Sequence, residues 1–188
     1  MATVVLFHSV LGLRPVELRA AERLRAAGHE VVTPDLFAGA TAPTVGEGVR
    51  LLDGIGWAAV TGRARRALAG LPDTAVLAGF SMGAGVVSSL WPERPAAAAV
   101  LLLHGAAGLP SAVRPGARVQ LHAAEPDPFA PPERVAALRA AAREAGVELE
   151  VFRYPGAGHF YTDAELRDFD PAAAGLTWER VAGLLSGL

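Results

Sequence analysis

The sequence predicts one α/β domain, with a mostly parallel sheet of about six strands flanked by helices. Apolar strand-like runs alternate with helix-like segments along the 188 residues. Several runs are nearly continuous in Val, Leu and Ala, which is typical of strands whose two faces are both covered. Such a repeat implies right-handed crossovers between parallel strands. No internal repeat or long linker divides the chain, so residues 1–188 are expected to form a single domain.

The expected strands are Thr3–His8, Glu30–Thr33, Thr74–Ala78, Ala97–Leu103, Ala117–Leu121 and Glu148–Phe152. The expected helices are Pro15–Ala27, a segment that begins at Thr44, Trp57–Ala69, a run from about Ala84 to Val87, a segment from Pro131 to Gly146, and Thr177–Leu185.

Local signals mark the helix ends. Gly28 and Gly146 can each close a helix as the residue after its last turn. Thr44 and Glu47 form a capping box, which Gly54 and Gly56 follow as breakers. The connection from residue 103 to residue 117 is too short for a helical lid, so we expect an open or shallow site.

The composition excludes several functional classes. Hydrophobic residues make up 52% and charged residues 19%, with a net charge of −2. This balance fits a globular protein and gives no basic field for nucleic acid or an anionic membrane. Cysteine is absent, which excludes disulfides, thiolate catalysis and Cys-ligated metals.

The chain opens on a strand-like run without a signal-peptide pattern, and no apolar run approaches the about 20 residues of a membrane span. We therefore expect a cytoplasmic protein.

A Gly-x-Ser-x-Gly motif at residues 79–83 is the most informative feature. It follows a strand-like run and precedes a helix-like run of small residues, which is the context of a nucleophile elbow. Such a turn holds the central residue above the sheet edge, and its glycines let strand and helix approach closely. Ser81 is the predicted nucleophile.

A serine hydroxyl needs an adjacent base, and in this arrangement the acid and then the histidine follow the nucleophile along the chain. Asp127 and His159 lie in that order, each after a predicted strand and at the sheet edge that carries Ser81. His159 would act as the base, and Asp127 would orient it. Two alternatives stay open: Asp127 could instead cap the next helix, and Glu125 could be the acid. Asp35 precedes Ser81 and is read as a turn residue.

The oxyanion of an acyl-transfer intermediate needs preorganised N–H donors. The backbone N–H groups of Met82, directly after the nucleophile, and of Val10, in the loop after the first strand, are predicted to supply them. The candidates for substrate contact are Ser9, Leu11, Phe37 and Phe160.

The histidines His8, His104 and His122 are expected to be packed or hydrogen-bonded rather than catalytic. No metal-ligand spacing is present, and the chemistry needs no cofactor.

Five stretches of the chain, in the same order, are similar to those of the dienelactone hydrolase family. They are His8–Leu13, Thr33–Phe37, Gly79–Gly83, Asp127–Pro131 and Tyr154–Phe160. The resemblance implies a compact α/β-hydrolase fold without a lid domain, and hydrolysis of an ester or lactone.

The chain departs from the best-known members in three respects. They carry cysteine at the elbow, where this chain has Ser81, and a glutamate in the oxyanion loop, where it has Ser9. The two changes agree, because a serine nucleophile needs only the histidine as its base. The arginines that bind the substrate carboxylate are also replaced, with Asp163 four residues after His159 and Gly39 near the second position. The resemblance therefore implies hydrolase chemistry on a substrate other than an anionic dienelactone.

Together these features predict a serine hydrolase that cleaves a carboxylic ester or lactone through an acyl-enzyme. The alternatives are a thioesterase or peptidase with the same triad, or a catalytically silent protein of this fold that binds a ligand. The expected partner is a small-molecule ester or lactone, with no nucleic acid or membrane, and the expected state is a monomer or homodimer.

Overall fold

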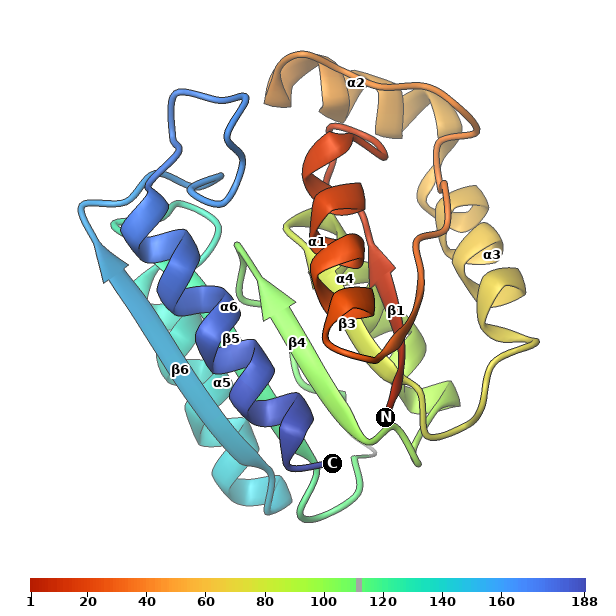
Figure 1. The fold of residues 1–188 in the computed structure, drawn as a ribbon, viewed down its shortest axis with the longest axis vertical. Coiled ribbons are helices and arrows are strands. Elements are labelled where there is room, and N and C mark those ends of the chain that lie inside the picture. Colours follow the sequence, from red (N-terminus) through yellow and green to blue (C-terminus); the bar gives the residue numbers. More distant parts are fainter. Residues whose placement is uncertain (111–112) are drawn as a thin grey trace.

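A computed structural model describes residues 1–110 and 113–188 and contains a six-stranded sheet with helices on both faces (Figure 1). In chain order the elements are β1 (Thr3–Phe7), α1 (Pro15–Ala26), β2 (Glu30–Val32), α2 (Val45–Ile55), α3 (Trp57–Leu68), β3 (Val76–Phe80), α4 (Met82–Leu90), the 3₁₀ turn η1 (Trp91–Glu93), β4 (Ala99–Leu103), β5 (Arg118–Glu125), α5 (Pro132–Ala145), β6 (Glu148–Pro155) and α6 (Pro171–Ser186).

All strands of the sheet are parallel, in the order β2-β1-β3-β4-β5-β6. The chain leaves β1 toward one edge, to β2, and then returns to β3 on the other side of β1. The strand order therefore reverses between β1 and β3, and crevices at such switch points are where open α/β sheets bind ligands. The register pairs Phe7 with Gly79, so β1 and β3 end side by side.

Helices α1 and α6 pack on one face of the sheet, and α3, α4 and α5 pack on the other (Figure 1). Alternate strand residues supply the two cores, with Val4 and Leu6 facing α1 and α6, and Val5 and Phe7 facing the other layer. Helix α2 lies across the carboxyl ends of the strands, at the top of Figure 1, and its Leu51, Leu52 and Ile55 pack against the core that α3, α4 and α5 share. The predicted fold class is confirmed.

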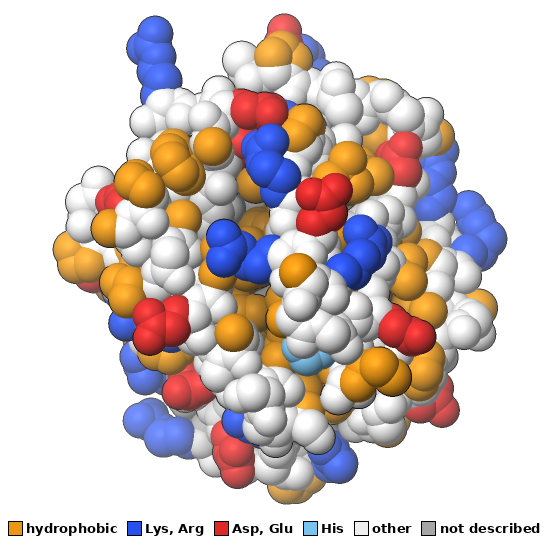
Figure 2. Space-filling model, viewed as in Figure 1, with side chains coloured by type: hydrophobic (Ala, Val, Ile, Leu, Met, Phe, Trp, Pro, Cys, Tyr) orange, Lys and Arg blue, Asp and Glu red, His pale blue; other side chains and the backbone are white. Residues whose placement is uncertain are grey.

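Basic and acidic side chains are interspersed with apolar ones on the face shown in Figure 2. This mixture agrees with the small net charge of −2. Within residues 1–110 and 113–188, no helix has the length and apolar character to cross a membrane.

Three strands extend further toward the carboxyl edge than predicted. β3 runs to Phe80, so the first two residues of the Gly-x-Ser-x-Gly motif belong to the strand. β5 continues to Glu125 and β6 to Pro155, because the two strands keep pairing beyond their apolar segments. A proline is tolerated there because β6 is an edge strand. The extension brings the loops after β5 and β6 closer to the elbow.

The last helix begins earlier than predicted, at Pro171 rather than near residue 177. The Asp170 carboxylate accepts hydrogen bonds from the N–H groups of Ala172 and Ala173, and Pro171 occupies the first helical position. Helix α2 passes Gly54 and ends before Gly56, whose φ is +84°. Thr44 caps α2 as predicted, since its hydroxyl accepts from Glu47 N–H.

Candidate active site

Ser81 occupies a strained turn between β3 and α4. Its φ is 51° and its ψ is −107°, a conformation that residues other than glycine rarely adopt. The backbone N–H of Ser81 donates to the carbonyl of Leu103 at 2.7 Å, which anchors the turn to β4. Such strain persists only where the surroundings impose it, and here it holds the serine above the edge of the sheet.

Two glycines make this turn possible. A Cβ on Gly79 would lie 2.2 Å from the carbonyl carbon of Gly83. A Cβ on Gly83 would lie 2.4 Å from the carbonyl oxygen of Phe7 in β1. Both distances are far below van der Waals contact, and both involve backbone that cannot move away. The glycine positions of the motif are therefore fixed by packing between β1, β3 and α4.

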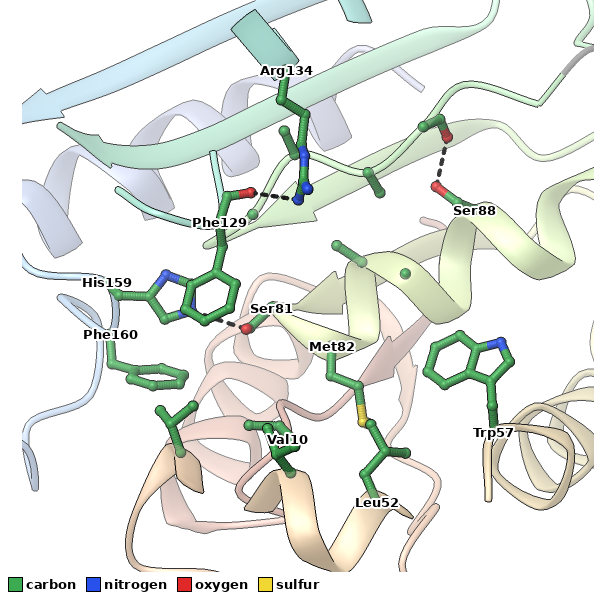
Figure 3. A pocket seen from close by; sticks show the side chains of 18 residues that line it. Val10, Leu52, Trp57, Ser81, Met82, Ser88, Phe129, Arg134, His159 and Phe160 are labelled. Atoms are coloured by element: carbon green, nitrogen blue, oxygen red, sulfur yellow. Dashed lines mark hydrogen bonds between the residues drawn. The ribbon is translucent and has the colours of Figure 1, made fainter. Parts of the chain in front are cut away.

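Ser81, His159 and Asp127 form one hydrogen-bonded chain. Ser81 Oγ lies 2.9 Å from His159 Nε2, and His159 Nδ1 lies 2.9 Å from Asp127 Oδ2 (Figure 3 shows the first of these bonds). The Asp127 side chain is fully buried, and that of His159 is 10% exposed. A carboxylate can only accept, so Nδ1 carries the imidazole proton and Nε2 is left free to accept the serine proton. This is the geometry that nucleophilic catalysis by serine requires.

The structure brings only one of the two candidate acids to His159. Asp127 also accepts from Phe129 N–H at 2.8 Å, and the N-cap position of α5 is Pro131 without a side-chain cap. The helix-cap alternative for Asp127 is therefore wrong. Glu125 is half exposed at the end of β5, with its carboxylate 3.8 Å from Arg153 Nε. The catalytic role of Asp127 stays a prediction, but Glu125 no longer competes for it.

Asp35 is a turn residue, as expected. Its carboxylate accepts from the backbone N–H groups of Phe37 and Gly39.

Val10 and Met82, the two predicted donors to an oxyanion, both lie at the cavity that contains Ser81. Met82 is the first residue of α4, so its N–H belongs to the group that has no partner within a helix, at the positive end of the helix dipole. Val10 follows β1, and both residues line the cavity that contains Ser81. Their role as N–H donors to a reacting oxygen stays a prediction.

Two features that the sequence did not reveal hold the Val10 loop. The Glu17 carboxylate, buried under the loop, accepts from Ser9 N–H at 3.2 Å and from Arg14 N–H at 3.0 Å. On the opposite side, Gly48 of α2 sits so close that a Cβ there would lie 2.4 Å from the carbonyl oxygen of Val10. The contact of Glu17 with the loop could have been inferred from one signal in the sequence. Glu17 is the third residue of a helix that begins at Pro15, a position from which a glutamate can accept from the backbone before the helix.

Burial raises the pKa of the Glu17 carboxyl from 4.5 to about 7, although its two N–H donors act in the opposite direction. The native protein therefore binds a proton at pH values where the unfolded chain has lost it. The stability that this group contributes is complete below about pH 4.5 and is lost as the pH rises through about 7. The full change corresponds to about 3 kcal/mol.

We expect the free energy of unfolding, relative to that of Glu17→Gln, to fall by up to about 3 kcal/mol between about pH 4 and pH 8. Urea unfolding of both proteins at several pH values measures this difference. Glu22→Gln serves as the matched control, because Glu22 is exposed on the same helix. A wild-type minus Glu17→Gln difference that does not change with pH would contradict the assigned protonation of Glu17.

The other buried histidines make structural contacts, as expected. His8 bonds the Ser9 carbonyl and Leu36 N–H, and His122 bonds the hydroxyl of Tyr154 and the side chain of Gln120. Burial lowers the pKa of His8, and lowers that of His122 to about 3.

His104 lies beside the catalytic candidates, with its ring 6.0 Å from that of His159 and its Nε2 3.0 Å from Thr162 Oγ1. Burial, together with the neighbouring His159, lowers the pKa of His104 well below its ordinary value. A neutral His104 places no positive charge next to the His159 ring.

Ser81 opens into a cavity of about 570 Å³ (Figure 3), which is within the usual size of small-molecule sites. The cavity is lined by Val10, Val45, Val49, Leu52, Trp57, Ser81, Met82, Ala84, Gly85, Ser88, Gly105, Ala106, Ala107, Gly108, Phe129, Arg134, His159 and Phe160. Residues 105–108, in the connection that was predicted to be too short for a helical lid, form one wall. A second wall that was not predicted comes from α2.

Of the four candidates for substrate contact, one lies at the cavity. Phe160 lines the cavity. Leu11 is buried behind Val10, and Phe37 is buried in the core against the ring of His8. Ser9 is buried too, and its hydroxyl accepts from Leu11 N–H. Ser9, Leu11 and Phe37 do not line the cavity, because neighbours of a loop residue in sequence can point into the core instead of the site.

The sequence model of the dienelactone hydrolase family matches residues 1–187. No curated protein matches the chain in sequence. Among solved structures, a dienelactone hydrolase-like promiscuous phosphotriesterase from metagenomic libraries is similar with a TM-score of 0.78 and 21% identity, over 100% of this chain and 87% of that one.

Two further structures are similar. A dienelactone hydrolase from Anabaena variabilis aligns with a TM-score of 0.64 and 19% identity, over 99% of this chain and 87% of that one. A phospholipase/carboxylesterase from Dyadobacter fermentans aligns with a TM-score of 0.64 and 17% identity, over 96% and 89%. At these identities the structural likeness shows a common fold.

Proposed function

The chain belongs to the dienelactone hydrolase family, and from that premise we propose that it hydrolyses a carboxylic ester or lactone through an acyl-enzyme on Ser81. The observation that carries the proposal is the hydrogen-bonded chain from Ser81 through His159 to Asp127 at the wall of the cavity. Family membership supports the reaction class, and the chain's own residues support the serine mechanism.

In the first half-reaction, Ser81 Oγ attacks the acyl carbonyl while His159 Nε2 takes the hydroxyl proton. The carbonyl oxygen becomes an oxyanion, and the N–H groups of Met82 and Val10 are the proposed donors to it. Asp127 stabilises the imidazolium that forms. His159 then gives the proton to the leaving alkoxide, which departs as the alcohol and leaves an ester on Ser81.

In the second half-reaction, a water molecule replaces the alcohol. His159 takes one proton from the water as its oxygen attacks the acyl carbon. The collapse of the second tetrahedral intermediate returns the proton to Ser81 Oγ and releases the carboxylic acid. For a lactone the alcohol and the acid are one molecule, so a hydroxy acid is the product.

The residue four positions after His159 is Asp163, and its surroundings favour a substrate that has no carboxylate at this point. Asp163 is buried and its carboxylate bonds Arg14 Nη1 at 2.7 Å. An aspartate that is already paired with an arginine offers no positive charge to a substrate. The resemblance associates this position with an arginine that binds an anionic dienelactone, and the ion pair between Asp163 and Arg14 replaces that function with a structural one.

Competition between water and methanol tests the acyl-enzyme. Two esters of one acid, p-nitrophenyl butyrate and phenyl butyrate, are hydrolysed in dilute methanol, and the ratio of methyl butyrate to butyrate is measured. Both esters give the same acyl-enzyme once the leaving group has departed. We therefore expect the same ratio of methyl butyrate to butyrate from both esters. Ratios that depend on the leaving group would contradict the acyl-enzyme, and a folded protein with no turnover would favour the silent binder.

A further inference from the structure

The cavity extends away from Ser81 along one face of α4. Ser81, Gly85 and Ser88 line it at spacings of four and three residues, which is the spacing of a single helix face. At 1.5 Å per residue, the distance along the axis from Ser81 to Ser88 is about 10 Å. Figure 3 shows the two serines at opposite ends of this stretch, with Trp57 beside the far end. The cavity is therefore a groove with α4 as its floor.

The walls of the groove are apolar along its length. Val45, Val49 and Leu52 line one side from α2, again at helical spacing, and Trp57 continues that side. Residues 105–108, with the sequence Gly-Ala-Ala-Gly, line another side together with Phe129. Exposed apolar side chains at Val49, Trp57 and Phe129 leave hydrophobic surface that a ligand could cover.

Two polar side chains of the groove each make a hydrogen bond within the protein. The Ser88 hydroxyl donates to the carbonyl of Gly108 at 2.7 Å, and Arg134 Nη1 donates to the carbonyl of Phe129 at 3.3 Å. Among the described residues that line the groove, Arg134 carries the only permanent charge. A ligand that fills the groove therefore gains binding free energy mainly by covering apolar surface.

The position of His159 decides which part of an ester enters the groove. The leaving oxygen must reach His159 Nε2 to receive its proton, so the leaving group lies on the His159 side of Ser81. In Figure 3 His159 and Phe160 lie on one side of Ser81, and Ser88 and Trp57 lie on the other. The groove therefore extends toward the acyl part of the substrate.

We infer that the groove between α4, α2 and Trp57 is an acyl-chain site for uncharged esters with an unbranched apolar acyl group of medium length. The inference rests on the proposed ester hydrolysis and names its substrate class. Gly85 keeps the groove open beyond Ser81, because it is the floor residue one turn further along α4, and a Cβ there would lie 3.5 Å from Trp57 Cη2. A long side chain at this position would occupy the space between the helix and the indole.

The test measures kcat/KM for p-nitrophenyl esters from acetate to dodecanoate. For the wild type we expect a rise of about three- to fourfold per added methylene, the value for burying one such group, up to the length of the groove near octanoate. For Gly85→Leu we expect the ratio of octanoate to acetate to fall by more than tenfold. Gly183→Leu is the matched control, on an open and exposed position of α6, and it should keep the wild-type ratio.

Each failure has its own meaning. If the wild type hydrolyses none of the esters, the proposed function fails. If it hydrolyses them with a flat chain-length profile, or if Gly85→Leu keeps the octanoate preference, the acyl-chain site is overturned while the hydrolase stands. A preference of more than tenfold for a monoester of suberic acid over the neutral octanoate would also overturn it, and would assign Arg134 to a substrate carboxylate.

Discussion

Replacing Ser81 by alanine is expected to lower kcat for p-nitrophenyl butyrate by about 10⁴-fold or more. The substitution removes the atom that lies 2.9 Å from His159 Nε2, so no acyl-enzyme can form. The elbow itself should persist, because Gly79 and Gly83 make the close approach of strand and helix and are unchanged. The residual rate would come from binding and the remaining N–H donors.

The matched control is Ser89→Ala on the same helix. The Ser89 hydroxyl donates to the Gly85 carbonyl and is exposed, so its loss should change kcat by less than about twofold, as for ordinary surface substitutions. Thermal unfolding of both variants checks that they are folded. A decrease of less than about tenfold in Ser81→Ala would show that another group performs the reaction.

Replacing Asp127 by asparagine is expected to lower kcat by up to about 10⁴-fold with a small change in fold stability. An asparagine amide can offer an N–H where the carboxylate only accepts. That N–H favours the imidazole tautomer with its proton on Nε2, and this tautomer cannot take the proton of Ser81. The defect should lie in kcat, because Asp127 is buried behind His159 and does not line the cavity.

Glu125→Gln is the matched control for the acid. Glu125 is the neighbouring carboxylate and the rival candidate, and it lies near Arg153 rather than His159. Steady-state kinetics on both variants should show a severe loss for Asp127→Asn and a change of less than about twofold for Glu125→Gln. The opposite ranking would mean that the acid had been assigned to the wrong residue.

Much of the site could be predicted because the sheet topology places its residues at one edge of the sheet. Parallel strands end at one edge, so Ser81, Asp127 and His159, which each follow a strand, had to lie near one another. The elbow could be recognised because only glycine fits its two packed positions. These features depend on local sequence and on chain order, both of which are visible without a structure.

The walls of the cavity could not be predicted in the same way. The apolar face of α2 was visible in Val45, Val49 and Leu52, but what that face covers depends on how the helix docks. Gly48 allows α2 to touch the Val10 backbone, a contact that no local pattern encodes. Glu17 was missed for a related reason, since a charged residue in an amphipathic helix ordinarily faces solvent, and here it is buried under a loop.

Labelling with a fluorophosphonate is the most direct measurement of whether Ser81 is the nucleophile of a working triad. The wild-type protein is incubated with the probe, ester hydrolysis is followed against time, and the modified residue is identified by peptide mass mapping. We expect one adduct per chain, on Ser81, with hydrolysis lost in proportion to labelling. Hydrolysis that persists in the fully labelled protein, or an adduct on another residue that accompanies its loss, would contradict a serine hydrolase built on Ser81.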